Sequence, residues 1–127
     1  MRIFKNKPFN RYARKQNITD GELCKAVAEI EGGLVDANYG GNLFKKRIPR
    51  KGAGKSGGHR AILAYVKGGK TFFMYGFEKS GRDNIEKDEE RDFKKLAKRY
   101  LTFQDAQLTL AKDENVLYEV NCDEENL

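Results

Sequence analysis

The residues NLFKKRIPRKGAGKSGGHR, Asn42–Arg60, carry the strongest pattern in the sequence. They begin with alternating apolar and basic residues, which predicts a strand near Leu43–Arg50. Phe44 and Ile48 share one face of this strand, and basic residues occupy the other. Four glycines in the second half oppose regular structure until the next apolar run begins. We therefore expect a basic strand, a glycine-rich loop and an apolar strand in succession.

This stretch is also strongly cationic. It contains one histidine, no carboxylate and seven basic side chains: Lys45, Lys46, Arg47, Arg50, Lys51, Lys55 and Arg60. Because cations without internal counter-ions repel one another, such a loop is best explained by an anion that it binds. Lys51 and Lys55 can approach the phosphates of RNA or DNA, and Arg60 can donate to two phosphate oxygens. The alternative is a solvated basic loop.

The segments after this loop predict a sheet. The run Arg60–Val66 is apolar on both faces, which is typical of a central strand that is covered on both sides. Gly68-Gly69 predicts a two-residue turn into a further strand over Lys70–Phe77. The three strands then form an antiparallel meander. Leu34–Gly41, which precedes them, is predicted to be a loop.

Helix signals stand on both sides of this sheet. Thr19 and Glu22 match a capping box, and Gly32-Gly33 ends the helix that the box begins. The other expected elements are a helix from Pro8 to Asn17, a long amphipathic helix from near Asp88, a short helix over Thr102–Lys112, and terminal strands at Arg2–Phe4 and Val116–Val120. The fold class is therefore α+β, a small twisted antiparallel sheet with N-terminal helices and a C-terminal helix.

Composition limits the class of protein. A chain of 127 residues predicts one domain over residues 1–127, with an acidic tail from about Glu119. The net charge of +6 indicates nucleic acid or an acidic protein as partner. Without an apolar leader or a long apolar run, we expect a cytoplasmic protein in which Cys24 and Cys122 are free thiols. Two isolated cysteines and one histidine do not furnish a standard zinc site.

Three local patterns have competing interpretations. The string GKS at Gly54-Lys55-Ser56 suggests a phosphate loop, but Pro49 replaces the required first glycine and a strand follows instead of a helix. His59, the sole histidine, is either structural or a proton-transfer group, whose pKa the cationic surroundings would lower. Lys79 and Arg82 lie after the third strand, where they either face the same site or are ordinary loop charges.

The order of elements and this string together resemble the RelE/ParE superfamily of bacterial toxins. The likeness is greatest to the RelE-type and HigB-like branch, whose hallmark is K-R-I-x-x-x-G-x-G-K-x-G-G-x-R. Here the string reads Lys46-Arg47-Ile48, Gly52, Gly54-Lys55, Gly57-Gly58 and Arg60. Leu23–Gly41 is also typical of this branch, and the resemblance extends roughly from Phe4 to Val120.

The resemblance implies a toxin of a type II toxin–antitoxin system that enters the ribosomal A site and cleaves mRNA. The ribose 2′-hydroxyl attacks the adjacent phosphodiester, with no metal and no other cofactor. Such a reaction needs a base, cations that stabilise the developing charge, and an acid for the leaving oxygen. The implied partners are a cognate antitoxin, the ribosome and mRNA, and no membrane.

The resemblance also assigns residues. The implied catalytic set is Lys55, His59, Arg60 and Lys79, with His59 or a lysine as base. The resemblance gives Lys51 and Arg82 as RNA-binding residues, and the basic stretch itself adds Lys45, Arg47 and Arg50. The chain departs from some relatives because no tyrosine follows the last hairpin strand around Asn84–Lys87, so the acid is unassigned. The alternative function is a non-catalytic protein, a ParE-like gyrase inhibitor or a nucleic-acid binder, that uses the same basic face.

Overall fold

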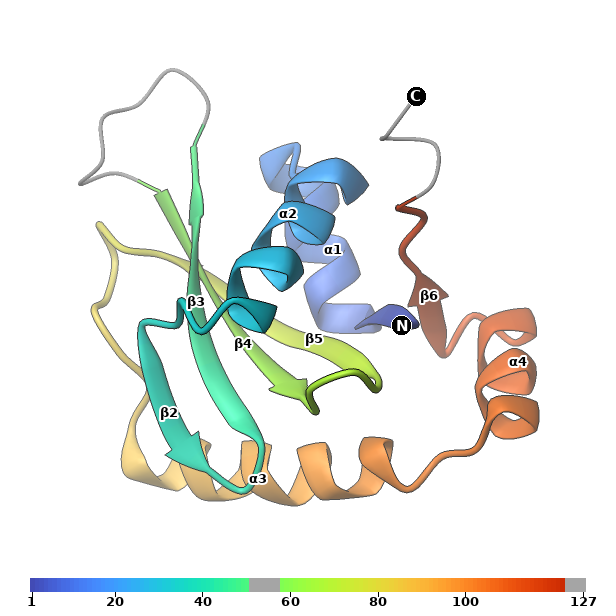
Figure 1. The fold of residues 1–127 in the computed structure, drawn as a ribbon. Coiled ribbons are helices and arrows are strands. Elements are labelled where there is room, and N and C mark those ends of the chain that lie inside the picture. The colour runs from blue at the N-terminus through green and yellow to red at the C-terminus, as the bar shows by residue number, and fades with distance from the viewer. Residues whose placement is uncertain (51–57, 123–127) are drawn as a thin grey trace.

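The computed structural model describes residues 1–50 and 58–122. Within these ranges the chain forms four helices and six strands. In chain order they are β1 (Ile3–Asn6), α1 (Lys7–Gln16), α2 (Asp20–Glu31), β2 (Ala37–Gly40), β3 (Leu43–Pro49), β4 (Gly58–Tyr65), β5 (Thr71–Glu78), α3 (Lys87–Leu101), α4 (Asp105–Asp113) and β6 (Leu117–Glu119). Helices α1 and α2 cover one face of the sheet, and α3 lies along the other (Figure 1).

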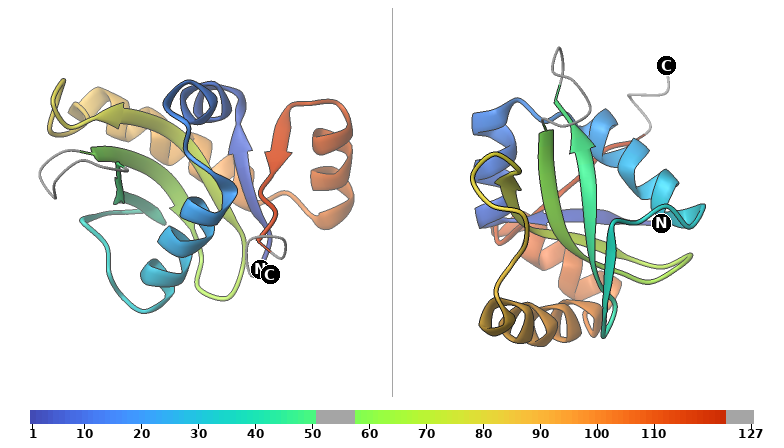
Figure 2. Two further views of the ribbon diagram at one scale, coloured as in Figure 1. Left: turned by 90° about the horizontal axis from the view of Figure 1, so that it is seen from above. Right: turned by 90° about the vertical axis from the view of Figure 1, so that its left-hand side faces the viewer.

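The strands form one sheet in the order β2-β3-β4-β5-β1-β6. The predicted antiparallel meander of β3, β4 and β5 is confirmed, and with it the α+β class. Strand β1 was not expected beside β5, where it runs parallel with Ile3 opposite Thr71. Between these two strands the chain forms α1, α2, β2, β3 and β4, so short-range sequence signals do not reveal the pairing. Figure 2 shows the twist of the sheet from two further directions.

The prediction that Leu34–Gly41 is a loop was wrong in part. Its second half forms the edge strand β2, with Ala37 opposite Lys45 of β3. Strand β2 has four residues and lies at the edge of the sheet, where it pairs with β3 alone. It carries little hydrophobic alternation, so the sequence gives no clear strand signal there. Gly40, Gly41 and Asn42 turn the chain from β2 into β3, and all three have positive φ angles.

The turn between β4 and β5 is displaced by one residue from its prediction. The amide of Gly69 donates to the carbonyl of Val66 at 2.9 Å, so the central residues are Lys67 and Gly68 instead of Gly68 and Gly69. Gly68 has φ +70°, a conformation that favours glycine at the third position of such a turn. The predicted hairpin is confirmed, but not the identity of its central pair.

The N-terminal helices begin and end where the sequence predicts. The side chain of Asn6 caps α1 by accepting from the amide of Phe9, and Asn17 ends it in the left-handed region with φ 58°. Thr19 and Glu22 form the complete capping box of α2. The loop between the two helices is therefore short, and both helices pack on the same face of the sheet, α1 against β5 and α2 against β3 (Figure 1).

Two hydrophobic cores lie on opposite faces of the sheet. The core under α1 and α2 includes Phe9, Leu23, Val27, Ile48, Ala61, Leu63 and Phe73. The core under α3 includes Leu43, Ile62, Ala64, Phe72, Met74, Phe77 and Ala97. All eight residues of β4 are buried, which confirms it as a central strand covered on both sides. Because successive side chains of a strand point to opposite faces, adjacent residues of β4 enter different cores.

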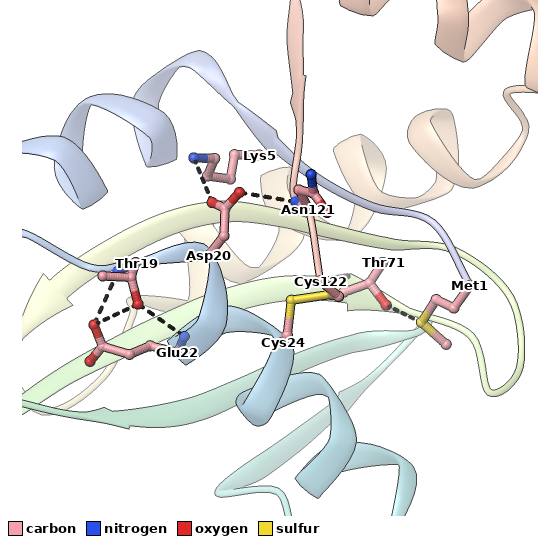
Figure 3. The surroundings of a disulfide bond; sticks show 9 residues. All are labelled: Met1, Lys5, Thr19, Asp20, Glu22, Cys24, Thr71, Asn121 and Cys122. Carbon is pink, nitrogen blue, oxygen red and sulfur yellow. Dashed lines mark hydrogen bonds and ion pairs between the residues drawn. A yellow bond between two sulfur atoms is a disulfide. The ribbon is translucent and has the colours of Figure 1, made fainter. Parts of the chain in front are cut away.

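Cys24 and Cys122 are joined by a disulfide, so the prediction of free thiols was wrong (Figure 3). Their Cα atoms lie 5.7 Å apart although 98 residues separate them in sequence. The bond ties the segment after β6 to α2. Beside it, Asp20 pairs with Lys5 at 3.6 Å and accepts from the amide of Asn121 at 2.9 Å. Such a distant pairing depends on topology, which the spacing of two cysteines does not reveal.

None of the described helices is long and apolar enough to cross a membrane. The end of the predicted acidic tail, from Asp123, lies outside the described residues, but its first part does not. Glu119 belongs to β6, where it accepts two hydrogen bonds from Arg2, at 2.8 and 2.9 Å. The expectation of one domain over residues 1–127 stays a prediction.

Candidate nucleic-acid interface

Arg60 lies on the face of the sheet that α3 covers in part. Its Cα partners are Arg47 on β3 and Phe77 on β5, and residues opposite each other in neighbouring strands share a face. Arg60 is 8% exposed, and its Nη1 donates to the carbonyl of His59 at 3.3 Å. Within residues 1–50 and 58–122, no carboxylate is paired with it. A buried guanidinium without a carboxylate partner is suited to receive an anion.

Arg82 lies on the aromatic side chains beside Arg60. Its guanidinium carbon is 5.4 Å from the centre of the Phe77 ring and 5.9 Å from that of Tyr75. Arg82 also donates to the hydroxyl of Tyr75 at 3.1 Å and forms an ion pair with Glu89 in the first turn of α3. These hydrogen bonds raise the pKa of Arg82 and lower the pKa of Glu89. Phe77 thus has an arginine neighbour on β4 and another on the segment after β5.

The remaining basic residues of this face come from β3. Nζ of Lys45 donates to the carbonyl of Asp83 at 3.4 Å, which joins β3 to the segment that carries Arg82. The side chain of Arg47 is exposed, and its backbone amide donates to the carboxylate of Asp36. The structure therefore brings Lys45, Arg47, Arg60 and Arg82 to one face of the sheet.

His59 lies on the opposite face, among residues of α1 and β5. It is 2% exposed, and its Nδ1 is 2.6 Å from the hydroxyl of Tyr12. The two rings meet edge to face, with centroids 5.5 Å apart. A Cβ atom on Gly76 would lie 2.4 Å from the Tyr12 ring, so this approach of α1 to β5 requires glycine. Arg50 and Glu78, which form an ion pair at 3.1 Å, occupy the same end of the sheet.

These surroundings fix the protonation of the pair. Burial, and then the charge of Arg50, lower the pKa of His59, against the opposing charges of Glu78 and Glu22. Burial, and then Glu78, raise the pKa of Tyr12 to about 12. Near neutral pH the imidazole is therefore neutral and the phenol keeps its proton, so Tyr12 can donate to Nδ1. His59 lines a small hollow with Gln16, Asn17, Ile18, Glu22, Pro49 and Arg50.

The other predicted site residues are dispersed. Lys79 is exposed directly after β5, and its amide donates to the carbonyl of Gly58 at 3.2 Å. Lys51 and Lys55 lie outside the described residues. Lys46, one of the seven basic residues of the stretch, is 4% exposed on the α2 face and pairs with Glu29 at 3.0 Å. Among the described residues, no group of three or more potential ligands could hold a metal ion.

Sequence reasoning missed four of these contacts. The alternation of β3 places Lys46 with Phe44 and Ile48, so its position on the α2 face could have been found. Glu89 lies in the acidic first turn of α3, and nothing local in the sequence indicates that it pairs with Arg82. Tyr75 packs against the core under α3, and its hydroxyl also accepts from Arg82, a contact that the sequence does not indicate. The Tyr12–His59 bond joins residues 47 positions apart, and no local signal predicts it.

The fold and this face define a small basic α+β protein in which arginines gather around an aromatic side chain on a sheet. A family profile described as "RelE toxin of RelE / RelB toxin-antitoxin system" matches residues 1–120. The chain belongs to the RelE toxin family. No curated protein sequence matches it. It is therefore a toxin of a toxin–antitoxin system, and membership of the family implies an antitoxin as its partner.

Proposed function

We propose that this toxin inhibits translation in the cytoplasm by cutting mRNA on the ribosome, with the ribose 2′-hydroxyl attacking the adjacent phosphodiester. The observation that carries the proposal is Arg60, which is buried beside Phe77 without a carboxylate partner among the described residues. Charge develops on the phosphoryl oxygens during this attack, and a preorganised guanidinium in a water-poor site stabilises it strongly. Arg60 is also the last residue of the family string in the sequence.

The other cations would hold the RNA backbone. Lys45, Arg47 and Arg82 lie on the face of Arg60, where they can contact phosphates on either side of the scissile one. Phe77 is 5% exposed and lies under the guanidinium of Arg82, so it supports that arginine on the face. By resemblance, Lys55 and Lys79 would share the stabilisation of charge, and Arg50 and Lys51 would hold the flanking backbone.

Two proton-transfer roles complete the mechanism. His59 or a lysine would take the proton of the 2′-hydroxyl, and the neutral imidazole is the form that can accept it. Because His59 faces α1 and Arg60 faces the opposite side, a base role for His59 requires the substrate to reach the end of β4. Tyr75 is our candidate proton donor to the 5′-oxygen, since its hydroxyl already contacts Arg82.

The experiment is in vitro translation with purified toxin, with mRNA ends mapped by primer extension in the presence and absence of ribosomes. Cuts should appear only on translated message. Arg60→Ala should reduce the single-turnover cleavage rate about 10²–10³-fold, with a much smaller loss in ribosome affinity. Lys98→Ala, an exposed change on α3, should keep the wild-type rate and is the matched control.

The outcomes separate the two functions. A binder without catalysis would leave mRNA intact, and Arg60→Ala would then change affinity alone. In that case gyrase supercoiling and direct binding to nucleic acid are the next assays. His59→Gln and Tyr75→Phe test the base and the acid, because the first removes a group that can accept a proton and the second removes one that can donate it.

A further inference from the structure

The disulfide between Cys24 and Cys122 lies beside an open hollow. Both cysteines are half-buried, and both line a hollow of about 650 Å³ that Thr19, Glu22 and Lys25 also line. Figure 3 shows the two sulfur atoms between α2 and the chain that leaves β6. Thiol–disulfide exchange needs a thiolate to reach one sulfur atom, and a hollow of this size admits a small thiol compound. The bond is therefore accessible in the folded protein.

This bond fastens the short segment that follows β6. Backbone pairing with β1 holds β6 itself. Beyond it, the amide of Val120 donates to the carbonyl of Ile3 at 2.8 Å, and the amide of Asn121 donates to the carboxylate of Asp20 at 2.9 Å. The side chain of Val120 packs in the core under α1 and α2. Because single hydrogen bonds at the edge of a sheet open readily, the disulfide determines how firmly Val120–Cys122 stays on α2.

The geometry of the pair favours a dithiol over a monothiol as its reductant. A thiolate attacks one sulfur, the S–S bond breaks, and the other cysteine leaves as a thiolate, which the charge of Lys25 beside the bond stabilises. Because the two Cα atoms are 5.7 Å apart, this thiolate can attack the mixed disulfide and expel the reductant. A dithiol prevents the reversal, since its second thiol attacks the mixed disulfide and releases the bound cysteine. Two electrons and two protons then pass to the protein, and the dithiol becomes an intramolecular disulfide.

We propose that Cys24 and Cys122 form a reversible redox site, whose substrate is a dithiol reductant and whose state controls the attachment of Val120–Cys122 to α2. The oxidised pair ties the segment to the helix. The reduced pair leaves it to the side chain of Val120 and two hydrogen bonds. In a reducing compartment a disulfide is usually transient, and its state then follows the local redox poise. This role does not require mRNA cleavage.

The first test follows reduction of the folded toxin without denaturant, by alkylating the released thiols and counting them by mass spectrometry. With dithiothreitol the rate should rise in proportion to the reductant concentration, because the dithiol attacks the native bond directly. Oxidised glutathione, added after removal of the dithiol, should restore the bond. A rate that stops rising at the unfolding rate, and that urea accelerates, would overturn the proposal, because the bond would then open only after unfolding.

A monothiol is the matched control for the reductant. At the same thiol concentration, 2-mercaptoethanol should leave at most about a tenth as much of the pair reduced at equilibrium, since the freed cysteine expels it from the mixed disulfide. Equal reduction by the two compounds would overturn the assignment of a dithiol as the substrate.

The second test compares amide hydrogen exchange in the oxidised and reduced toxin. The amides of Val120 and Asn121 should exchange at least about tenfold faster after reduction, because local opening is no longer limited by the covalent tie. The amide of Gly69, which is bonded in the β4–β5 turn, is the internal control and should keep its rate. Cys24→Ser with Cys122→Ser should exchange like the reduced toxin and should not respond to the dithiol.

Two results would overturn the control of this segment by the redox site. One is equal exchange of Val120 and Asn121 in the two states. The other is an equal rise at Gly69, which would show a general loss of stability instead of a local release. Both tests use the toxin without RNA, so a wild-type toxin that fails to cleave mRNA would refute the proposed function alone.

Discussion

His59 and Arg60 are adjacent in the chain, but their side chains lie on opposite faces of the sheet, one against Tyr12 and the other in line with Phe77. Both residues are almost fully buried, so the separation is fixed by two different cores. The cationic stretch of the sequence is thereby divided. Arg60 joins the arginine-rich face, and His59 joins the contact between α1 and the sheet.

The protonation of His59 should make stability depend on pH. Its pKa is lowered in the folded protein from the ordinary value of 6.5, so the unfolded chain takes up a proton first as the pH falls. The free energy of unfolding should therefore decrease as the pH falls below about 6.5 and reach a new level below the folded pKa. Burial and then the charge of Arg50 produce this shift, and the charges of Glu78 and Glu22 oppose it.

Urea unfolding between about pH 5.5 and about pH 7.5 measures this effect. In His59→Gln the free energy of unfolding should depend less on pH, because this variant lacks the only histidine of the chain. Arg50→Gln should make the loss of stability at low pH smaller, since Arg50 lowers the folded-state pKa of His59 and the unfolded value does not change. Identical slopes in wild type and His59→Gln would contradict the prediction.

Gly76 and Tyr12 should be energetically coupled. An added Cβ at Gly76 would lie 2.4 Å from the Tyr12 ring, so Gly76→Ala should push the ring from its place and weaken its bond to His59. We expect a loss of about 1–3 kcal/mol, as for overpacking of a core. In a Tyr12→Ala background the same change should cost much less, and a double-mutant cycle by urea unfolding measures the difference. Additive losses would show that the ring does not depend on this glycine.

The disulfide should contribute strongly to stability. A bond between residues 98 positions apart restricts the unfolded chain over most of its length. Cys24→Ser with Cys122→Ser should therefore lower the free energy of unfolding by about 2–5 kcal/mol. In denaturant without reductant, alkylation should label no cysteine, and after reduction it should label two. Two reactive thiols in the unreduced protein would instead agree with a cytosolic dithiol.

Lys46 and Glu29 should respond unequally to substitution. Lys46 has a side chain 5% exposed, whereas Glu29 is 37% exposed, so Glu29→Ala leaves a buried ammonium without its partner. This change should cost about 1–3 kcal/mol, and Lys46→Met should change stability by less than about 1 kcal/mol. Thermal unfolding of both variants tests the order. Because Lys46 lies on the α2 face, Lys46→Met should also leave RNA binding nearly unchanged. Arg47→Met, on the opposite face, should weaken RNA binding.

Local rules predicted much of the fold. The capping box of α2, the end of α1 at Asn17, the meander and the doubly covered β4 all follow from spacing, periodicity and turn residues. These features depend on interactions within a few residues, which the order of side chains specifies directly. The sequence also marked Arg60 and Arg82 as members of a basic site, by charge and by resemblance.

Only the tertiary structure determined what each side chain faces. The sequence alone specified a basic strand and loop followed by a central apolar strand. The arrangement of the helices then placed Arg60 on one face of the sheet and His59 on the other, paired Arg82 with Glu89, and brought Cys24 to Cys122. These contacts join residues up to 98 positions apart, and they form because two hydrophobic faces of one sheet are covered by helices from different parts of the chain.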